Sequence, residues 1–166
     1  SADVGRDAAA AVQAARASQG QIATLILPSD TSWDEGGVVA DALVVPASPT
    51  LDPFAVQNAA RVLRAQKNVL ILLAGRAALG ASQALAWRIA RATGATLMAD
   101  FVTGHVQRGR GRLQLERVPY NTDLAVQALA RFEHIILVNA KPPVGFFAYP
   151  GKPSKQYPER AQLHVL

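Results

Sequence analysis

The chain has 166 residues, half of them hydrophobic, with a formal net charge of +5 and no cysteine. That length suffices for one domain with a full core, or for one domain and part of another. The lack of cysteine excludes disulfide scaffolds, thiolate metal sites and cysteine nucleophiles. No apolar run approaches the roughly 20 residues that cross a bilayer, and no signal peptide is recognisable, so we expect a soluble, cytoplasmic protein without a membrane partner.

The first third of the chain predicts a helix and a strand followed by a linker. Residues 7–17 are alanine-rich, which favours a helix. The apolar run over residues 22–28 is stopped by proline and predicts a short buried strand. From residue 29 to residue 53, proline, glycine and small polar residues dominate, which indicates a linker.

Three helices are predicted after the linker. Asp52 is placed to cap the first, which begins at Pro53 and runs to about residue 66. The second spans about residues 81–93, and Gly94 is placed to close it in a left-handed conformation. The third follows Thr122, which is the predicted N-cap.

Four apolar strands alternate with these helices, over residues 69–75, 95–100, 134–140 and 161–166. The first shows no polar alternation, as expected for a central strand covered on both faces. Strands and helices that alternate at this length indicate a parallel sheet with right-handed crossovers. We therefore predict an α/β fold, a Rossmann-like doubly wound parallel sheet, preceded by a separate helix-strand unit.

In such folds the ligand crevice lies beyond the carboxyl ends of the strands. The residues at those ends form the candidate binding set, which is Gly75, Arg76, Asp100, Asn139 and Lys141. The proline-, glycine- and aromatic-rich segment NAKPPVGFFAYPGKPS leaves the sheet at the same edge. No residue is predicted to be catalytic, and no set of metal ligands is recognisable.

Nucleotide-binding motifs do not match. Gly75 and Gly80 are spaced after a strand as in a phosphate loop, but Ala81 and Ser82 stand where the lysine should be. No GxGxxG follows any predicted strand. These patterns argue against a nucleotide triphosphatase and against a dinucleotide enzyme.

The histidines give no catalytic signal. His134 and His164 lie within or beside predicted strands, and we expect each to be far from a second histidine or a spaced carboxylate. A core or strand-edge role is therefore favoured over catalysis or metal binding. His105 lies in a long loop, where we expect it to be accessible.

A basic segment, residues 107–117, is the strongest local charge in the chain. Arginines spaced by glycine could follow a phosphate backbone. Phe101 and Tyr120 flank the segment without interleaving with it, so a base-stacking platform is not indicated. We expect a mobile loop in an α/β domain, and nucleic-acid binding is the less favoured alternative. The arginines are Arg108, Arg110, Arg112 and Arg117.

Five stretches resemble the middle of an acetolactate synthase-like, thiamine diphosphate-dependent enzyme. They are GQIATLILPSDTSWDE, VLILLAGRAALG, TGATLMADF, HIILVNAKPPVGFFAYPGKPS and the final LHVL. The resemblance extends over nearly the whole chain. The most specific, FFAYPGKPS, is similar to a subgroup called acetolactate synthase-like or benzoylformate decarboxylase-like. The resemblance implies that residues 1–36 end a pyrimidine-binding domain, 37–52 form a linker, and 53–166 form a truncated central domain.

The resemblance also implies where the chemistry belongs. Such enzymes activate thiamine with a glutamate and hold diphosphate and magnesium with a glycine-aspartate-glycine motif, and this sequence contains neither. Thiamine diphosphate and Mg would belong to the full-length parent, a decarboxylase or carboligase of 2-keto acids. We expect the chain alone to be inactive and to hold the two thiamine-binding domains apart. Its implied partners are those remaining domains and other subunits of a homo-oligomer.

Central domains of this family bind FAD, ADP or nothing. Of the flavin-binding pattern only Gly75 is retained, and Lys141 stands where an arginine would be, although lysine cannot form a bidentate fork. We therefore expect no cofactor in this chain. Phe146, Phe147 and Tyr149 would either anchor a neighbouring domain or cover the sheet edge. A stand-alone nucleotide- or flavin-binding domain is the alternative function.

Overall fold

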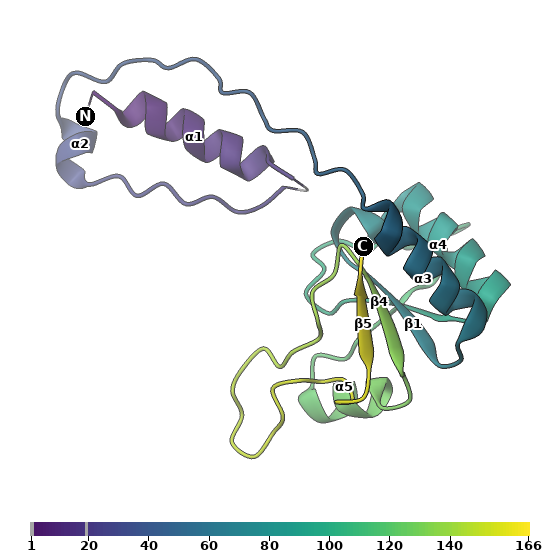
Figure 1. Cartoon of the computed structure of the whole chain (residues 1–166). Helices are drawn as coiled ribbons and strands as arrows, with labels where there is room; N and C mark the ends of the chain where they lie inside the picture. Colours follow the sequence, from purple (N-terminus) through teal and green to yellow (C-terminus); the bar gives the residue numbers. More distant parts are fainter. Residues whose placement is uncertain (1, 19) are drawn as a thin grey trace. The chain divides into compact units, whose positions relative to one another are not determined.

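The computed structural model describes residues 2–18 and 20–166. The chain forms two compact units, Ser1–Thr50 and Leu51–Leu166 (Figure 1). None of the described helices is long and apolar enough to cross a membrane.

The first unit contains two helices and two long extended segments (Figure 1). Its helices are α1 (Val4–Arg16) and α2 (Ser29–Trp33). The strand predicted over residues 22–28 was wrong, because that segment is extended but pairs with no other strand. Ile22 is 96% exposed and Ile26 is 81% exposed. The apolar composition indicates a strand, but a strand needs hydrogen bonds to a neighbouring backbone, and no described residue of this unit pairs with the segment in that way.

The second unit is built on a sheet of five parallel strands in the order β3-β2-β1-β4-β5, which confirms the predicted fold class. Four of the strands were predicted. The fifth, β3, was missed because its two residues are charged and exposed, and so carry no apolar signal. The strands are β1 (Val69–Leu73), β2 (Thr96–Ala99), β3 (Glu116–Arg117), β4 (His134–Val138) and β5 (Gln162–Val165).

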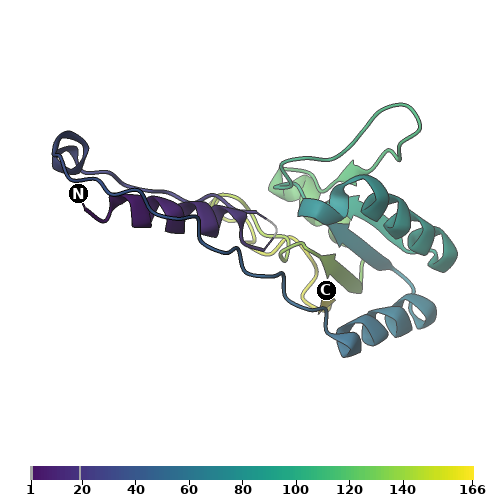
Figure 2. The ribbon, with the colours of Figure 1, turned by 90° about the horizontal axis from the view of Figure 1, so that it is seen from above.

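Helices cover both faces of this sheet. Successive residues of β1 point to opposite sides, so β1 contributes apolar side chains to the core on each face. Leu70 and Leu72 pack with residues of α5 (Thr122–Leu129) in one core cluster. Ile71 and Leu73 pack on the other face with α4 (Gly80–Thr93), and Val69 packs there with α3 (Pro53–Ala65). The connection between β2 and β3 projects from the sheet as a long loop (Figure 2).

Two of the three predicted helix caps are confirmed. The Asp52 side chain accepts a hydrogen bond from the backbone N–H of Phe54, and Gly94 ends α4 with a left-handed φ of 76°. Thr122 is not the cap of α5. The cap is Asn121, whose extended backbone and side-chain oxygen serve the first free N–H groups of the helix, and Thr122 is already its first residue.

Candidate functional site

The predicted crevice lies where the winding of the sheet reverses. From β1 the chain proceeds to β2 and β3 on one side, and it then returns to β4 on the other side of β1. The switch point is therefore between the carboxyl ends of β1 and β4, where folds of this class bind ligands. The backbone turns sharply there, with φ of 50° at Gly75 and 55° at Asn139.

An apolar pocket of about 360 Å³ opens beside this switch point, between α3, α4 and the sheet. Its volume is within the range of small-molecule sites. Its polar groups are few and come from Arg76, Ser82 and Asn139. The rest of the lining is mainly aliphatic and includes Leu63, Ile71, Ile89 and Ile136.

The structure brings together only part of the candidate binding set. Arg76 and Asn139 both line the pocket, and Gly75 begins the short 3-10 helix, Gly75–Ala78, that carries Arg76. Asp100 follows β2, one strand away from the switch point, and is 3% exposed. Lys141 is exposed in the loop after β4 and does not line the pocket.

Asp100 has an unusual environment for a carboxyl group. Burial raises its pKa above the ordinary value of 3.8. The backbone N–H groups of Phe101 and Val102 and the charge of Arg117 oppose this shift. Arg117 is fixed nearby because its guanidinium donates to the carbonyl of Thr103 at 2.7 Å. Arg117 was predicted to lie in the basic loop, but it belongs to β3.

The raised pKa of Asp100 predicts a pH dependence of stability. A carboxyl group whose pKa is higher in the folded state contributes stability below its unfolded pKa, and this stability is lost as the pH rises through the folded pKa. We expect Asp100→Asn to raise the Tm at pH 7, with a gain that shrinks toward pH 3. Thermal unfolding followed by circular dichroism measures this, with Asp34→Asn, at an exposed position, as the control. A lower Tm at pH 7 would show that the hydrogen bonds to the ionised carboxylate outweigh its burial.

The histidine prediction was wrong in one respect. His134 and His164 were expected to be far from a second histidine, but Nδ1 of His134 lies 3.2 Å from Nε2 of His164. Parallel pairing of β4 with β5 places Ile136 opposite His164, so that both histidines lie on one face of the sheet. Sequence reasoning missed this pair because the two histidines meet only when β5 lies beside β4, and the order of the strands in the sheet was not predicted. Among residues 2–18 and 20–166, no group of three or more potential ligands could hold a metal ion.

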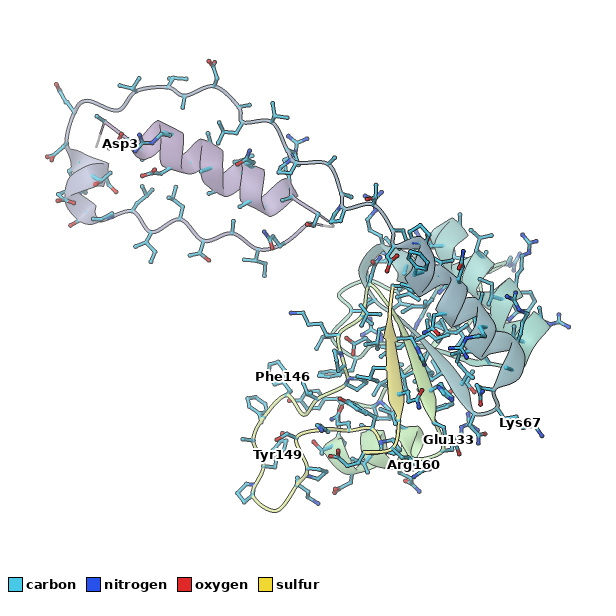
Figure 3. The ribbon with its side chains drawn as sticks, viewed as in Figure 1. Asp3, Lys67, Glu133, Phe146, Tyr149 and Arg160 are labelled. Carbon is cyan, nitrogen blue, oxygen red and sulfur yellow. The ribbon has the colours of Figure 1, made fainter. Side chains whose placement is uncertain are left out.

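Aromatic rings form a continuous series from the carboxyl edge into the long β4–β5 loop. Successive ring centroids from Phe101 through Tyr120, Phe146 and Phe147 to Tyr149 are 4.6 to 6.1 Å apart. Figure 3 shows Phe146 and Tyr149 on this loop. Only Phe101 packs against the core, whereas Phe146 is 61% and Phe147 55% exposed. The loop is attached to α5 by Lys152, whose Nζ lies 2.7 Å from Asp123 Oδ2.

The basic loop is attached to the start of α4. The side-chain oxygen of Gln107 accepts hydrogen bonds from the backbone N–H of Gly80 at 2.8 Å and from Arg112 at 2.6 Å. Arg108 and Arg110 are exposed. Two arginines of the segment, Arg112 and Arg117, are therefore engaged within the protein. No aromatic ring interleaves with the other two in the described residues.

Comparison with known proteins relates the chain to one larger protein. Over 165 residues, 99% of its length, the chain is 41% identical to a Mycobacterium tuberculosis protein named "Putative acetolactate synthase large subunit IlvX". The chain spans 32% of the length of that relative. No protein-family model and no solved structure matches the chain.

Proposed function

We propose that this chain is the part of a thiamine diphosphate-dependent, acetolactate synthase-like enzyme that joins and spaces two thiamine-binding domains. The observation that carries the proposal is 41% identity, over 99% of the chain, to about a third of a protein named as an acetolactate synthase large subunit. In this proposal residues 53–166 are the central domain, 37–52 the linker, and 1–36 the end of a pyrimidine-binding domain. The parent would decarboxylate or join 2-keto acids.

The first unit supports this proposal because it leaves apolar surface without cover. None of its described residues is buried. Ile22 and Val39 in the extended segments and Trp33 at the end of α2 are each more than four fifths exposed. Contiguous exposed apolar surface in a soluble protein marks a site that another protein surface covers. Further domains of a longer parent would supply that surface.

The second unit supports a spacer role through its rigidity. All five residues of β1 and the three central residues of β4 are buried, and both strands sit in the middle of the sheet. Interiors packed in this way deform little, so that a domain joined at each end would be held at a fixed separation. The exposed aromatic series would then contact a neighbouring domain, or a neighbouring subunit of a homo-oligomer.

The residues present do not fit thiamine diphosphate and its magnesium ion. Magnesium prefers several oxygen ligands, and no cluster of three potential ligands exists in the described part of the chain. The buried carboxyl of Asp100 has a raised pKa and faces Arg117. We therefore propose that other parts of the parent hold this cofactor, and that the chain alone is inactive.

The switch-point pocket does not fit FAD or ADP either. A diphosphate needs several N–H groups or cations, and Arg76 is the only cation among the pocket-lining residues. The flavin-binding pattern has an arginine at the position of Lys141, and Lys141 does not line the pocket. We propose that the domain works without a nucleotide.

A ligand-induced change in thermal stability tests the cofactor part of the proposal. A ligand at one hundred times its dissociation constant adds about 2.7 kcal/mol of stability, which is a shift of several degrees in Tm. We expect no shift of the chain with FAD, ADP or NAD. A shift with FAD alone, abolished by Arg76→Ala, would instead support the alternative of a flavin-binding domain.

Exchange of this segment into the relative tests the spacer role. The chimera carries residues 2–166 in place of the homologous third of the Mycobacterium tuberculosis protein. We expect it to fold, and we expect isothermal titration calorimetry with thiamine diphosphate and Mg to give the same result for the chimera and for the unaltered relative. A second chimera, with Phe146→Ala, Phe147→Ala and Tyr149→Ala, should have a lower Tm if the aromatic series contacts another domain. A folded first chimera that has lost binding present in the relative would contradict the proposal.

A further inference from the structure

Four side chains link α3 to the two outermost strands on that side of the sheet. Arg61 donates from Nη2 to the side-chain oxygen of Asn58 at 2.5 Å. The side-chain nitrogen of Asn58 lies 3.1 Å from Nδ1 of His164, and Nε2 of His164 lies 3.2 Å from Nδ1 of His134. We call Arg61, Asn58, His164 and His134 the histidine network. It connects α3, β5 and β4.

Arg61 determines the direction of every hydrogen bond in this network. A guanidinium group can only donate, so the oxygen of Asn58 faces Arg61 and its NH₂ group faces His164. Nδ1 of His164 must then accept, which places the single proton of its neutral ring on Nε2. That N–H donates to Nδ1 of His134, whose own proton is therefore on Nε2. Both tautomers follow from this one fixed donor.

Protonation of either ring breaks the network. A proton on Nδ1 of His164 would face the NH₂ group of Asn58, and a proton on Nδ1 of His134 would face the N–H of His164, so two donors would meet in each case. A metal ion held between the two rings meets the same obstacle. It would need the lone pair on Nε2 of His164 and would move that proton to Nδ1. The network is complete only with two neutral, metal-free rings.

The surroundings of His164 act in the same direction. Its pKa lies below the ordinary value of 6.5, first because of burial and then because of the charges of His134 on β4 and Arg61 on α3. On β5 itself, the neighbour on the same face is Gln162, which is uncharged. No carboxylate contributes to the shift.

We propose that the histidine network is an acid-sensitive connection that holds α3 against β5 at neutral pH and releases it when the pH falls. The connection also bears on the switch-point pocket. Leu63 of α3 and Leu166, which directly follows β5, both line that pocket. Loosening α3 from β5 therefore changes the walls of the pocket. This inference rests on the geometry of the network and does not depend on the proposed function.

The sign of the pH effect follows from linkage. A histidine whose pKa is lowered in the folded state binds fewer protons there than in the unfolded chain, so its stabilising contribution is complete above 6.5 and is lost as the pH falls toward the folded pKa. For one proton the unfolding equilibrium constant rises by up to about tenfold per pH unit across that window. We expect this dependence in urea unfolding of the whole chain between pH 7.5 and pH 5.

Asn58→Asp should reverse the effect. A carboxylate only accepts hydrogen bonds, so it would accept from Nδ1–H of a charged His164, which favours the protonated ring. We expect this variant to lose less stability than the unaltered chain on acidification, or to gain some. The control is His105→Ala, which changes an exposed loop histidine. We expect this variant to have the same pH profile of stability as the unaltered chain.

Nitrogen-detected NMR of the unaltered chain tests the same proposal without a variant. At pH 7.5 both His134 and His164 should carry their proton on Nε2, and Arg61→Met should release His164 to a mixture of tautomers. An Nδ1–H tautomer of His164 in the unaltered chain would overturn the proposal. An unchanged acid profile in a folded Asn58→Asp variant would do so as well.

Discussion

Replacing Phe132 by alanine is expected to destabilise the second unit by about 3–5 kcal/mol, because the change leaves a cavity in a packed core. The Phe132 ring is 1% exposed and belongs to the core cluster between α5 and the sheet. Leu70, Leu129 and Leu137 are fully buried members of the same cluster. At about 4 °C per kcal/mol for a unit the size of Leu51–Leu166, the loss in Tm is large enough for differential scanning calorimetry to resolve easily.

Phe146→Ala is the matched control for this change. It removes the same number of atoms from a ring that is 61% exposed and that lies beside the rings of Tyr120 and Phe147. Exposed substitutions of this kind usually change stability by no more than about 0.5 kcal/mol. If Phe146→Ala were as destabilising as Phe132→Ala, the aromatic series would be part of the core rather than a surface available to another domain.

Sequence reasoning succeeded where a local pattern determines the structure. The central strands were predicted because β1 and β4 are buried on both faces, and burial on both faces produces an uninterrupted apolar run. Caps were predicted where one side chain decides the conformation, as at Asp52 and Gly94. In these places the local sequence contains the whole physical cause of the structure.

Sequence reasoning failed where the cause lies in a distant part of the chain. Residues 22–28 have the composition of a strand but pair with no other strand in their unit. His134 and His164 contact each other only because β5 pairs with β4. The candidate binding set was chosen by position at strand ends, and two of its residues, Arg76 and Asn139, line the pocket. Position alone could not show that Asp100 is buried one strand away.

Separating the two units should have the second large effect. We expect residues 51–166 to unfold cooperatively with nearly the Tm of the whole chain, because all buried residues of the described structure lie in that unit. We expect residues 2–50 alone to show no cooperative transition. The helix α1 has no buried residue. Its contacts with the extended segments include side-chain hydrogen bonds from Gln13 to the carbonyl of Val44 and from Gln21 to the carbonyl of Ala14, and both hydrogen bonds are exposed. An isolated helix of 13 residues is marginal in water.

Circular dichroism during heating measures both halves of this prediction, with the whole chain as the reference. A cooperative transition in residues 2–50 would show that the first unit is a domain in its own right, and its exposed apolar segments would then need another explanation. A gradual change supports the proposal that further domains of a longer parent cover these segments, because backbone partners and cover for the apolar side chains are what the segments lack. The same reasoning predicts that residues 2–50 become ordered only when joined to the rest of a longer parent. Limited proteolysis would detect this by comparing cleavage within residues 2–50 in the chimera and in the free segment. An ordered backbone resists cleavage, whereas an exposed extended backbone is cut readily.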